Sequence, residues 1–276
     1  MVDERLEFMK YLANKAGGML KSLWRSNALG VRYKEDGSVL TDADLRVRDL
    51  VRGECEKKFP SYRLLTEESK DSLERLAKQD VFIVDELDGT HEFSEGKKEF
   101  CFMVAYTEKG VPKIGVVYEP AKGRLFSAEK HYKAYLTENE CIVELEPLRH
   151  GVTLENALVG DSVNYKGKKF DRMYEALNIP RKNNRISGAI GTRMMEVALQ
   201  NLHIIPAYHR LKEWDVAAGD VILEARGIPV VDFKGNSLIY NKSDPRMQDG
   251  VLVVHPDIKK VTLENVACLG KEGWSP

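Results

Sequence analysis

The sequence predicts an α/β fold built from two parts of different organisation. In the first part, two helical periodicities are followed by several β-branched and aromatic runs joined by short turns, which is typical of helices with an antiparallel sheet. In the second part, strand-like and helix-like segments alternate from about Thr153 onward, which is typical of an α/β unit. We expect an α+β domain at residues 1–150 and an α/β domain at 151–276.

Two helices are predicted at the start of the chain. In the first, apolar residues recur at three- and four-residue steps, at Leu6, Met9, Leu12, Ala13, Ala16, Met19, Leu20 and Leu23. The second is predicted from Asp42 to Phe59, because Pro60 cannot continue it. Thr41 is expected to cap this helix, since its hydroxyl can accept a hydrogen bond from an amide of the first turn.

Strands dominate the rest of the first part. They are predicted for the runs at residues 62–69, 80–85, 99–120 and 124–136. The run "DVFIVD" has the length and composition of a buried strand and is expected to end at Asp85. Lys109 and Gly110 predict a turn between two strands, and residues 72–79 a small helix or a flexible excursion.

The second part alternates strand and helix. A strand is predicted at residues 157–162, and helices at 169–179, 193–202 and 214–227, the last closed by Gly227. No repeat, low-complexity tract or Pro/Gly/Ser-rich linker separates the two halves, so we expect them to pack tightly together.

Composition excludes several classes of function. With 43% hydrophobic and 31% charged residues, the chain is typical of a soluble globular protein. Its 42 basic and 43 acidic residues leave a net charge of -1, which gives no basis for binding nucleic acid or a membrane surface. No segment approaches the roughly 20 apolar residues of a membrane span, and the charged N-terminus does not resemble a signal peptide.

Cysteine and histidine usage gives no sign of a zinc or redox site. No two of the four cysteines have C-x-x-C spacing; they are Cys55, Cys101, Cys141 and Cys268. This pattern favours a reducing, cytoplasmic location. The six histidines are scattered, and we expect them to be ordinary surface or core residues.

Five acidic residues in four separate segments carry the functional argument. Each lies at a turn or at the end of a predicted element, where its carboxylate can point into a shared pocket; they are Asp44, Glu67, Asp85, Asp88 and Asp215. Hard divalent cations prefer oxygen ligands, and Mg²⁺ is usually held by a few carboxylates, waters and substrate phosphate oxygens. The pattern therefore predicts a metal-dependent phosphatase.

The segment "DELDGT" has the most suggestive local chemistry. Asp85 and Asp88 can converge on two ions roughly 3.5–4 Å apart. Gly89 and Thr90, at the start of a helix, offer free amides and a hydroxyl to a phosphate. Each acidic segment alone also has an ordinary structural explanation, as a turn, a solvated surface or a helix cap. Four such features together, in this order, are much less probable than any one of them.

Four motifs resemble those of the inositol monophosphatase superfamily, the lithium-sensitive Mg²⁺-dependent phosphomonoesterases. They are T-x-x-D from Thr41, E-E from Glu67, D-x-[IL]-D-G-T from Asp85 and W-D-x-A-[AG]-G from Trp214. "DGTHEF", "GVPKIGVVYEPAKGRLFSA" and "GNSLIYNK" are more similar to the 3'(2'),5'-bisphosphate nucleotidase branch. Inositol-specific members tend to carry an acid seven residues before the aspartate of W-D, where this chain has Tyr208.

The resemblance implies a layered αβαβα sandwich of the sugar-phosphatase type that binds two Mg²⁺ ions and a third, weaker one. It implies ion ligands at Glu67, Asp85, the Leu87 carbonyl, Asp88 and Asp215, with Asp85 shared. Thr90 and Asp44 match a proton relay that orients the attacking water, and Glu67 is a competing base. Candidate substrate-binding residues are Asp88, Gly89, Thr90, Asp215, Arg193, Asn164, His91 and Lys242.

The chain departs from the superfamily pattern at two positions. Thr66 replaces a glycine before the two glutamates, and Glu86 replaces a proline that stiffens the ligand-bearing turn. Glu86 is expected to face solvent, as long acidic side chains usually do. Met195 stands where the nucleotidases have a lysine, so the residues that read the base and the ribose are not determined.

Three hypotheses of function remain. The first is a 3'(2'),5'-bisphosphate nucleotidase that converts 3'-phosphoadenosine 5'-phosphate to AMP and phosphate. The second is an inositol-1-monophosphatase or a fructose-1,6-bisphosphatase-like sugar phosphatase. The third is a catalytically impaired protein that binds phosphate or nucleotide, against which the retention of five mutually repelling acids argues. The partner is a small phosphorylated molecule, and a homodimer is compatible with the sequence.

Overall fold

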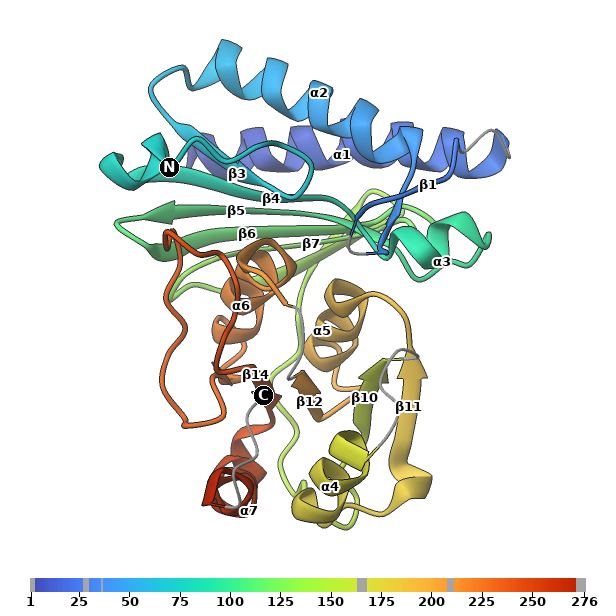
Figure 1. Ribbon diagram of the computed structural model, residues 1–276, viewed down its shortest axis with the longest axis vertical. Helices are drawn as coiled ribbons and strands as arrows, with labels where there is room; N and C mark the ends of the chain where they lie inside the picture. The colour runs from blue at the N-terminus through green and yellow to red at the C-terminus, as the bar shows by residue number, and fades with distance from the viewer. Residues whose placement is uncertain (1–2, 27–29, 36, 163–167, 208–210, 272–276) are drawn as a thin grey trace.

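The computed structural model describes residues 3–26, 30–35, 37–162, 168–207 and 211–271. Figure 1 shows five layers, which confirms the predicted αβαβα sandwich. Helices α1 (Glu4–Ser26) and α2 (Asp42–Lys58) cover one face of a seven-stranded sheet. Helices α5 (Ile190–Ala198) and α6 (Ala217–Glu224) lie between this sheet and a five-stranded one. The remaining layer consists of α4 (Lys168–Leu177) and α7 (Lys259–Lys271), which pack on the outer face of the second sheet.

The first sheet has the strand order β3-β4-β5-β6-β7-β8-β9. Its strands are β3 (Arg63–Thr66), β4 (Asp80–Asp88), β5 (Cys101–Glu108), β6 (Val111–Glu119), β7 (Arg124–Glu129), β8 (Ala134–Glu138) and β9 (Cys141–Glu144). β3 and β4 pair in parallel, and the remaining neighbours pair antiparallel. The predicted antiparallel sheet is therefore confirmed, with one parallel pair at its edge.

The second sheet is mixed and has the order β11-β10-β12-β14-β13. Its strands are β10 (Val159–Ser162), β11 (Asn184–Ser187), β12 (Ile204–Ala207), β13 (Val230–Val231) and β14 (Val251–Val254). β10 is parallel to β11 and β12, while β14 is antiparallel to both of its neighbours. The predicted alternation of strands and helices thus produces a partly parallel sheet.

The remaining elements are short or lie at the outer layers. They are the hairpin β1 (Arg32–Tyr33) and β2 (Val39–Leu40), the helices α3 (Thr90–Ser94), α4 (Lys168–Leu177) and α7 (Lys259–Lys271), and the 3-10 turns η1 (Glu74–Ala77), η2 (Arg181–Asn183), η3 (Glu213–Asp215) and η4 (Pro256–Ile258). Turn η1 confirms the small helix expected within residues 72–79.

Local sequence signals explain the first two helices. The apolar stripe of α1 is buried against the first sheet, and Met9, Leu12 and Ala16 are fully inaccessible. At the start of α2, Thr41 Oγ1 accepts a hydrogen bond from the amide of Ala43, and Asp44 Oδ2 accepts one from the amide of Thr41. This reciprocal capping box confirms the predicted start of the helix.

Several predicted boundaries were wrong. Strand β4 does not end at Asp85 but continues to Asp88, because a register shift lets the backbone bulge without leaving the sheet. The helix predicted from Trp214 is divided into turn η3 and helix α6, so Asp215 lies in the turn and does not cap the helix. Strand β9 was not predicted. The turn at Lys109 and Gly110 is confirmed, with φ values of 53° and 74°.

The two halves share one hydrophobic core. The inner face of the first sheet, the two middle helices and the second sheet contribute to a single cluster of buried residues; among them are Met103, Val117, Met194, Ile205, Val221 and Val253. The expected tight packing of the halves is therefore confirmed. The domain boundary near residue 150 stays a prediction.

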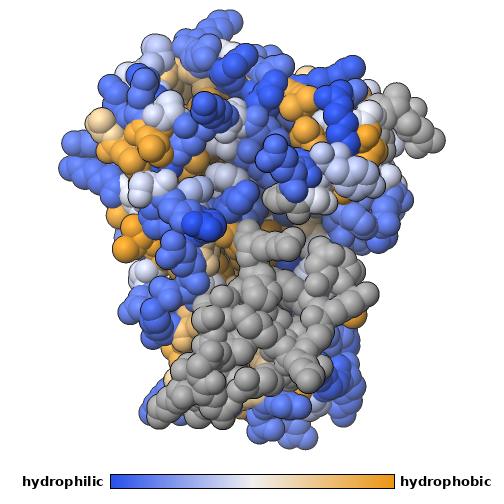
Figure 2. All heavy atoms as spheres, viewed as in Figure 1, coloured by the Kyte–Doolittle hydropathy of each residue, from blue (hydrophilic) through white to orange (hydrophobic). Residues whose placement is uncertain are grey.

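In the described ranges, no helix is long and apolar enough to cross a membrane. The face shown in Figure 2 is mostly hydrophilic, with apolar residues in small separate groups.

Close approach of helix α6 to strand β6 depends on Gly115. A Cβ atom at this position would lie 2.3 Å from the carbonyl oxygen of Ala218 and 3.0 Å from Cβ of Val221. Both contacts are shorter than packed atoms tolerate, and the first is to the backbone, which cannot rotate away. Gly115 therefore sets the distance at which α6, and the turn η3 before it, lie on the first sheet.

We predict that Gly115→Ala destabilises the protein by about 1–3 kcal/mol, because the added methyl group must push α6 away from the sheet. Chemical denaturation measures this change. Gly53→Ala is the matched control, since Gly53 lies exposed in α2 with no atom within 4 Å of an added Cβ. The control should stabilise the protein by about 0.5–1 kcal/mol. Equal stability of Gly115→Ala and the unaltered protein would contradict the packing argument.

Candidate metal centre and its cavity

The bulge in strand β4 presents two acids from one short stretch of chain. Asp85 still pairs with Met103 in the sheet and Asp88 with Cys101, whereas the two residues between these acids lie outside the ladder. The amide of Leu87 donates to Asp85 Oδ1 at 2.9 Å, which fixes the orientation of that carboxylate. Both acidic side chains are buried.

Three carboxylates from three separate segments of the chain converge beside this bulge. Oxygens of Glu67, Asp85 and Asp215 all lie within 4.8 Å of one another. Burial raises the pKa of Asp85 and of Asp215 well above the usual value, and the charge of Glu67 raises both further. A cluster of oxygen donors that repel one another in this way fits a hard divalent cation. We call these three residues the carboxylate triad.

Asp88 lies in the same cavity but outside the triad. Its Oδ2 accepts a hydrogen bond of 2.6 Å from the amide of Gly191 and a weaker one of 3.5 Å from the thiol of Cys101. Burial raises the pKa of Asp88 to about 6, while the Gly191 amide and the charge of Arg193 oppose that increase. The carboxylate is thus held by the first turn of α5, and a role as ion ligand stays a prediction.

Lys34 contacts the site, although it lies in none of the sequence motifs. Its Nζ atom lies 2.9 Å from Glu67 Oε1 and 2.5 Å from Glu68 Oε1. Burial disfavours its charged form, but the two glutamates together raise the pKa of Lys34. Lys34 follows strand β1, so the N-terminal hairpin contributes a positive charge to the edge of the triad.

Thr90 and Asp44 meet as the resemblance implies. Thr90 Oγ1 lies 3.1 Å from Asp44 Oδ1 and 2.9 Å from the carbonyl oxygen of Leu87. Burial raises the pKa of Asp44 despite its hydrogen bonds with Thr41 and Thr90. The hydroxyl of Thr90 therefore has two acceptors for one proton, and a buried carboxylate is one of them.

Gly89 shapes the turn that precedes α3. Its φ is 87°, and a Cβ atom there would lie 2.6 Å from the carbonyl oxygen of Glu99. A glycine is required at this position both by conformation and by space. Helix α3 begins at Thr90 as predicted, and it spans only five residues.

A cavity of about 890 Å³ joins these groups and is lined by both halves of the chain. Its walls include the candidates Glu67, Asp85, Leu87, Asp88, Gly89, Thr90, His91, Arg193 and Asp215. Asn164 and Tyr208 fall outside the described residues. Lys242 does not line the cavity and is used elsewhere.

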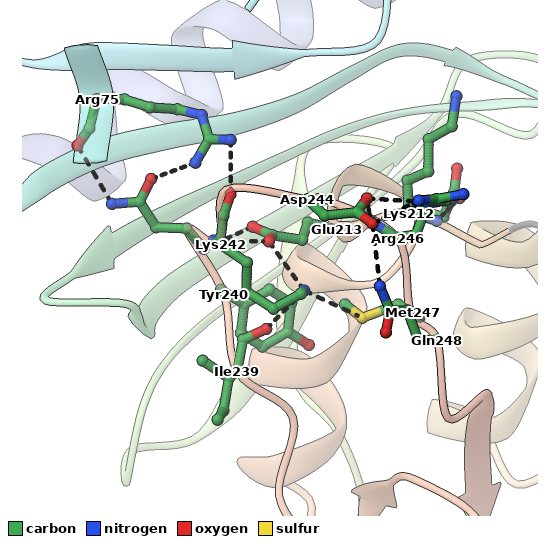
Figure 3. Close-up of polar contacts among 12 residues, drawn as sticks. Arg75, Lys212, Glu213, Ile239, Tyr240, Lys242, Asp244, Arg246, Met247 and Gln248 are labelled. Carbon is green, nitrogen blue, oxygen red and sulfur yellow. Dashed lines mark hydrogen bonds and ion pairs between the residues drawn. The ribbon is translucent and has the colours of Figure 1, made fainter. Parts of the chain in front are cut away.

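Lys242 belongs to a network of polar contacts around Glu213 (Figure 3), which lies in the same turn, η3, as Asp215. Glu213 is fully buried and accepts hydrogen bonds from the amide of Asn241 at 2.6 Å and from the amide and Nζ of Lys242, each at 2.9 Å. From the other side, Arg75 donates to Asn241 Oδ1 at 2.6 Å and to the carbonyl of Lys242 at 2.7 Å. The turn that carries Asp215 is thereby tied to the connection between β3 and β4.

Glu86 does not face solvent, and that prediction was wrong. Its side chain is fully buried because strand β4 continues through the bulge and carries the residue into the interior. Among the described residues, neither carboxylate oxygen of Glu86 nor Oγ1 of Thr66 has a partner with good hydrogen-bond geometry. Burial raises the pKa of Glu86 to about 8, and the nearby hydroxyl of Thr66 only partly opposes this shift.

Comparison with known proteins extends over nearly the whole chain. A family model described as the inositol monophosphatase family matches residues 1–270. The chain is 27% identical over 272 residues to the fructose-1,6-bisphosphatase/inositol-1-monophosphatase of Thermotoga maritima, which covers 97% of this chain and 99% of that relative. It is 28% identical over 251 residues to the 3'(2'),5'-bisphosphate nucleotidase CysQ of Salmonella typhimurium, with 90% and 98% covered.

A solved structure shows the same fold. The extragenic suppressor protein SuhB of Bartonella henselae superposes with a TM-score of 0.81 at 23% identity, covering 96% of this chain and 98% of that one.

We predict that the metal-free protein loses stability as pH rises from about 4.5 to about 8, because Glu86 stays protonated in the folded state while it ionises in the unfolded chain. A pKa shift of this size lowers the free energy of unfolding by on the order of 5 kcal/mol between these two pH values. Glu86→Gln cannot ionise at this position. The variant should therefore have the same stability as the unaltered protein below pH 4.5 and become increasingly more stable than it as the pH rises.

Denaturant titration at several pH values, with a chelator present, measures this effect. Glu56→Gln is the control, since Glu56 is exposed on α2 and its replacement should change stability little at any pH. A constant difference between Glu86→Gln and the unaltered protein from pH 4 to 9 would show that Glu86 does not titrate in this way.

Proposed function

The chain belongs to the inositol monophosphatase family, whose members are metal-dependent phosphatases, and from this premise we propose a specific activity. The protein is a Mg²⁺-dependent phosphomonoesterase that hydrolyses nucleoside 3'(2'),5'-bisphosphates, converting 3'-phosphoadenosine 5'-phosphate to AMP and phosphate. The observation that carries the proposal is the carboxylate triad on the wall of a cavity large enough for a nucleotide.

The residues of the triad would hold the metal. Glu67, Asp85 and Asp215 supply carboxylate oxygens, and Asp88 and Leu87 line the same cavity. When bound, divalent cations neutralise charge on the phosphoryl oxygens and lower the pKa of a coordinated water. The protein contributes a fixed arrangement, because phosphoryl transfer depends mostly on positioning and charge neutralisation.

Thr90 and Asp44 would handle the proton of the attacking water. Asp44 Oδ1 can accept the hydroxyl proton of Thr90, whose oxygen is then free to accept a proton from the water. Asp44 stays in place because its other oxygen is held in the capping box of α2. Glu67 is the alternative base, although in this structure one of its oxygens is paired with Lys34.

The choice of a nucleotide substrate is supported by two observations. The motifs "DGTHEF" and "GNSLIYNK" resemble the nucleotidase branch, and the Salmonella typhimurium nucleotidase matches 90% of the chain. The cavity volume lies within the range of about 300–1,000 Å³ that is typical of small-molecule sites, so the cavity admits a nucleotide but does not favour it over a sugar phosphate.

A sugar phosphatase is the second candidate. The Thermotoga maritima relative, named for fructose bisphosphate and inositol phosphate, matches 97% of the chain at nearly the same identity. Lithium sensitivity and a homodimer remain predictions. A cytoplasmic location also remains one, and the free thiols of Cys55, Cys101 and Cys141 are consistent with it.

We predict that phosphate release from 3'-phosphoadenosine 5'-phosphate requires Mg²⁺ and exceeds release from inositol 1-phosphate and fructose 1,6-bisphosphate. A colorimetric phosphate assay with and without a chelator measures this directly. Asp85→Asn should reduce the activity on the order of 100-fold or more, because it removes a charge from the triad while its side-chain oxygen can still accept from Leu87. Faster release from either sugar phosphate would replace the proposed substrate, and undiminished activity of Asp85→Asn would refute the site.

We also predict that Thr90→Val lowers kcat on the order of 100-fold, because valine keeps the shape of threonine but cannot transfer a proton. Thr90→Ser retains the hydroxyl and should keep most of the activity. Steady-state kinetics on both variants, with folding checked by circular dichroism, compares them. Equal activity of the valine and serine variants would eliminate the relay and leave Glu67 as the candidate base.

A further inference from the structure

Arg193 is a buried positive charge that lacks a full set of hydrogen-bond partners. It lies in α5, is 3% exposed, and lines the cavity of the carboxylate triad. Its Nη1 atom has no acceptor among the described residues, and its Nε atom makes only a long bond of 3.4 Å to the carbonyl of Ala189. An arginine side chain carries five donors and is always charged in proteins, so this environment leaves donors unused.

The nearby carboxylates do not supply the acceptors that Arg193 lacks. Asp88 and Asp161 are close enough for its charge to lower the pKa of each, but neither forms an ion pair with it within the described part of the chain. Both already have other partners. Asp88 accepts from the Gly191 amide, and Asp161 accepts from the Ser162 amide at 2.8 Å, from Tyr174 at 3.2 Å and from Asn184 at 3.1 Å.

A buried charge without a partner is costly, and the cost is offset when an anion supplies the missing acceptors. The planar fork of arginine suits a phosphate, which can accept two parallel hydrogen bonds from it. Arg193 comes from the C-terminal half, whereas two triad members, Glu67 and Asp85, come from the N-terminal half. The cavity therefore has one wall suited to a cation and a separate group suited to an anion.

We propose that Arg193 binds a second anionic group of the substrate, so that the enzyme selects phosphate esters that carry another phosphate. The inference rests on the proposed function, since it assumes that the reacting phosphate lies at the triad. In 3'-phosphoadenosine 5'-phosphate the 3'-phosphate reacts, and Arg193 holds the 5'-phosphate. The product AMP keeps the group that Arg193 binds.

Two substrates that differ only in the second phosphate test this role. The unaltered enzyme should hydrolyse adenosine 3',5'-bisphosphate with a kcat/KM at least about tenfold above that for adenosine 3'-monophosphate. Arg193→Met keeps an unbranched side chain without the charge, and it should bring this ratio close to one, mainly by raising KM for the bisphosphate. Arg193→Lys restores the charge without the fork and should recover part of the ratio.

A purely structural role for Arg193 would give a different result. If Arg193 only neutralised the negative charges of Asp88 and Asp161, its replacement would lower kcat/KM for both substrates alike. The ratio of the two kcat/KM values would then stay unchanged. Arg185→Met is the matched control, because Arg185 is an exposed residue of β11 whose side chain, within the described ranges, bonds only to the backbone carbonyls of Lys182 and Asn184. It should leave the ratio unchanged. A ratio near one in the unaltered enzyme overturns the proposal.

AMP binding separates this inference from the proposed function. In titration calorimetry without metal, AMP should bind the unaltered protein at least about tenfold more tightly than it binds Arg193→Met. Equal affinities would overturn the role of Arg193 even if the nucleotide were hydrolysed. If no nucleotide is hydrolysed, the proposed function fails, and the comparison of inositol 1,4-bisphosphate with inositol 1-phosphate tests Arg193 on the sugar substrates instead.

Discussion

Mutual repulsion among clustered carboxylates is the constraint on which the rest of this structure depends. Buried Asp85 lies together with half-buried Glu67 and Asp215, and desolvation already opposes the ionisation of Asp85 and Asp215. The fold must supply the free energy that holds them there, and the hydrophobic core continuous across both halves is its main source. Binding of a cation offsets the repulsion, so the same arrangement that costs stability without metal creates affinity for it.

Strand pairing explains how residues far apart in sequence reach this centre. β3 and β4 are parallel, and Thr66 pairs with Val84, so Glu67, the first residue after β3, lies beside Asp85 within β4. Asp215 comes from the second half of the chain and lies in turn η3, which the hydrogen bonds of Glu213 hold in place. Helix α6, which follows this turn, packs closely on the first sheet at Gly115. The site is therefore assembled only when both halves pack, and its cavity is lined by both.

The sequence predicted the elements whose signals are local, together with the residues that carry motifs. The layered fold, the Thr41 cap and the meeting of Thr90 with Asp44 agree with the structure. What it could not predict depends on distant partners. The orientation of Asp88 is set by the amide of Gly191, which lies 103 residues later, and Lys34 reaches Glu67 from a hairpin without a motif. No local pattern encodes either contact.

The two residues that depart from the superfamily pattern, Thr66 and Glu86, are neighbours in space, so their effects on the site must be considered together. Glu86 replaces a proline at a bulge position outside the sheet ladder, so its amide is not needed for pairing and the exchange leaves the strand intact. Thr66, which replaces a glycine, places its hydroxyl close to the buried carboxyl group of Glu86. The charge of Glu86 also contributes to the raised pKa of Asp85, after burial and the other acids. Because Glu86 ionises only near pH 8, the residue that replaces proline acts on this metal-ligand candidate through its charge only above that pH, and not through strand pairing.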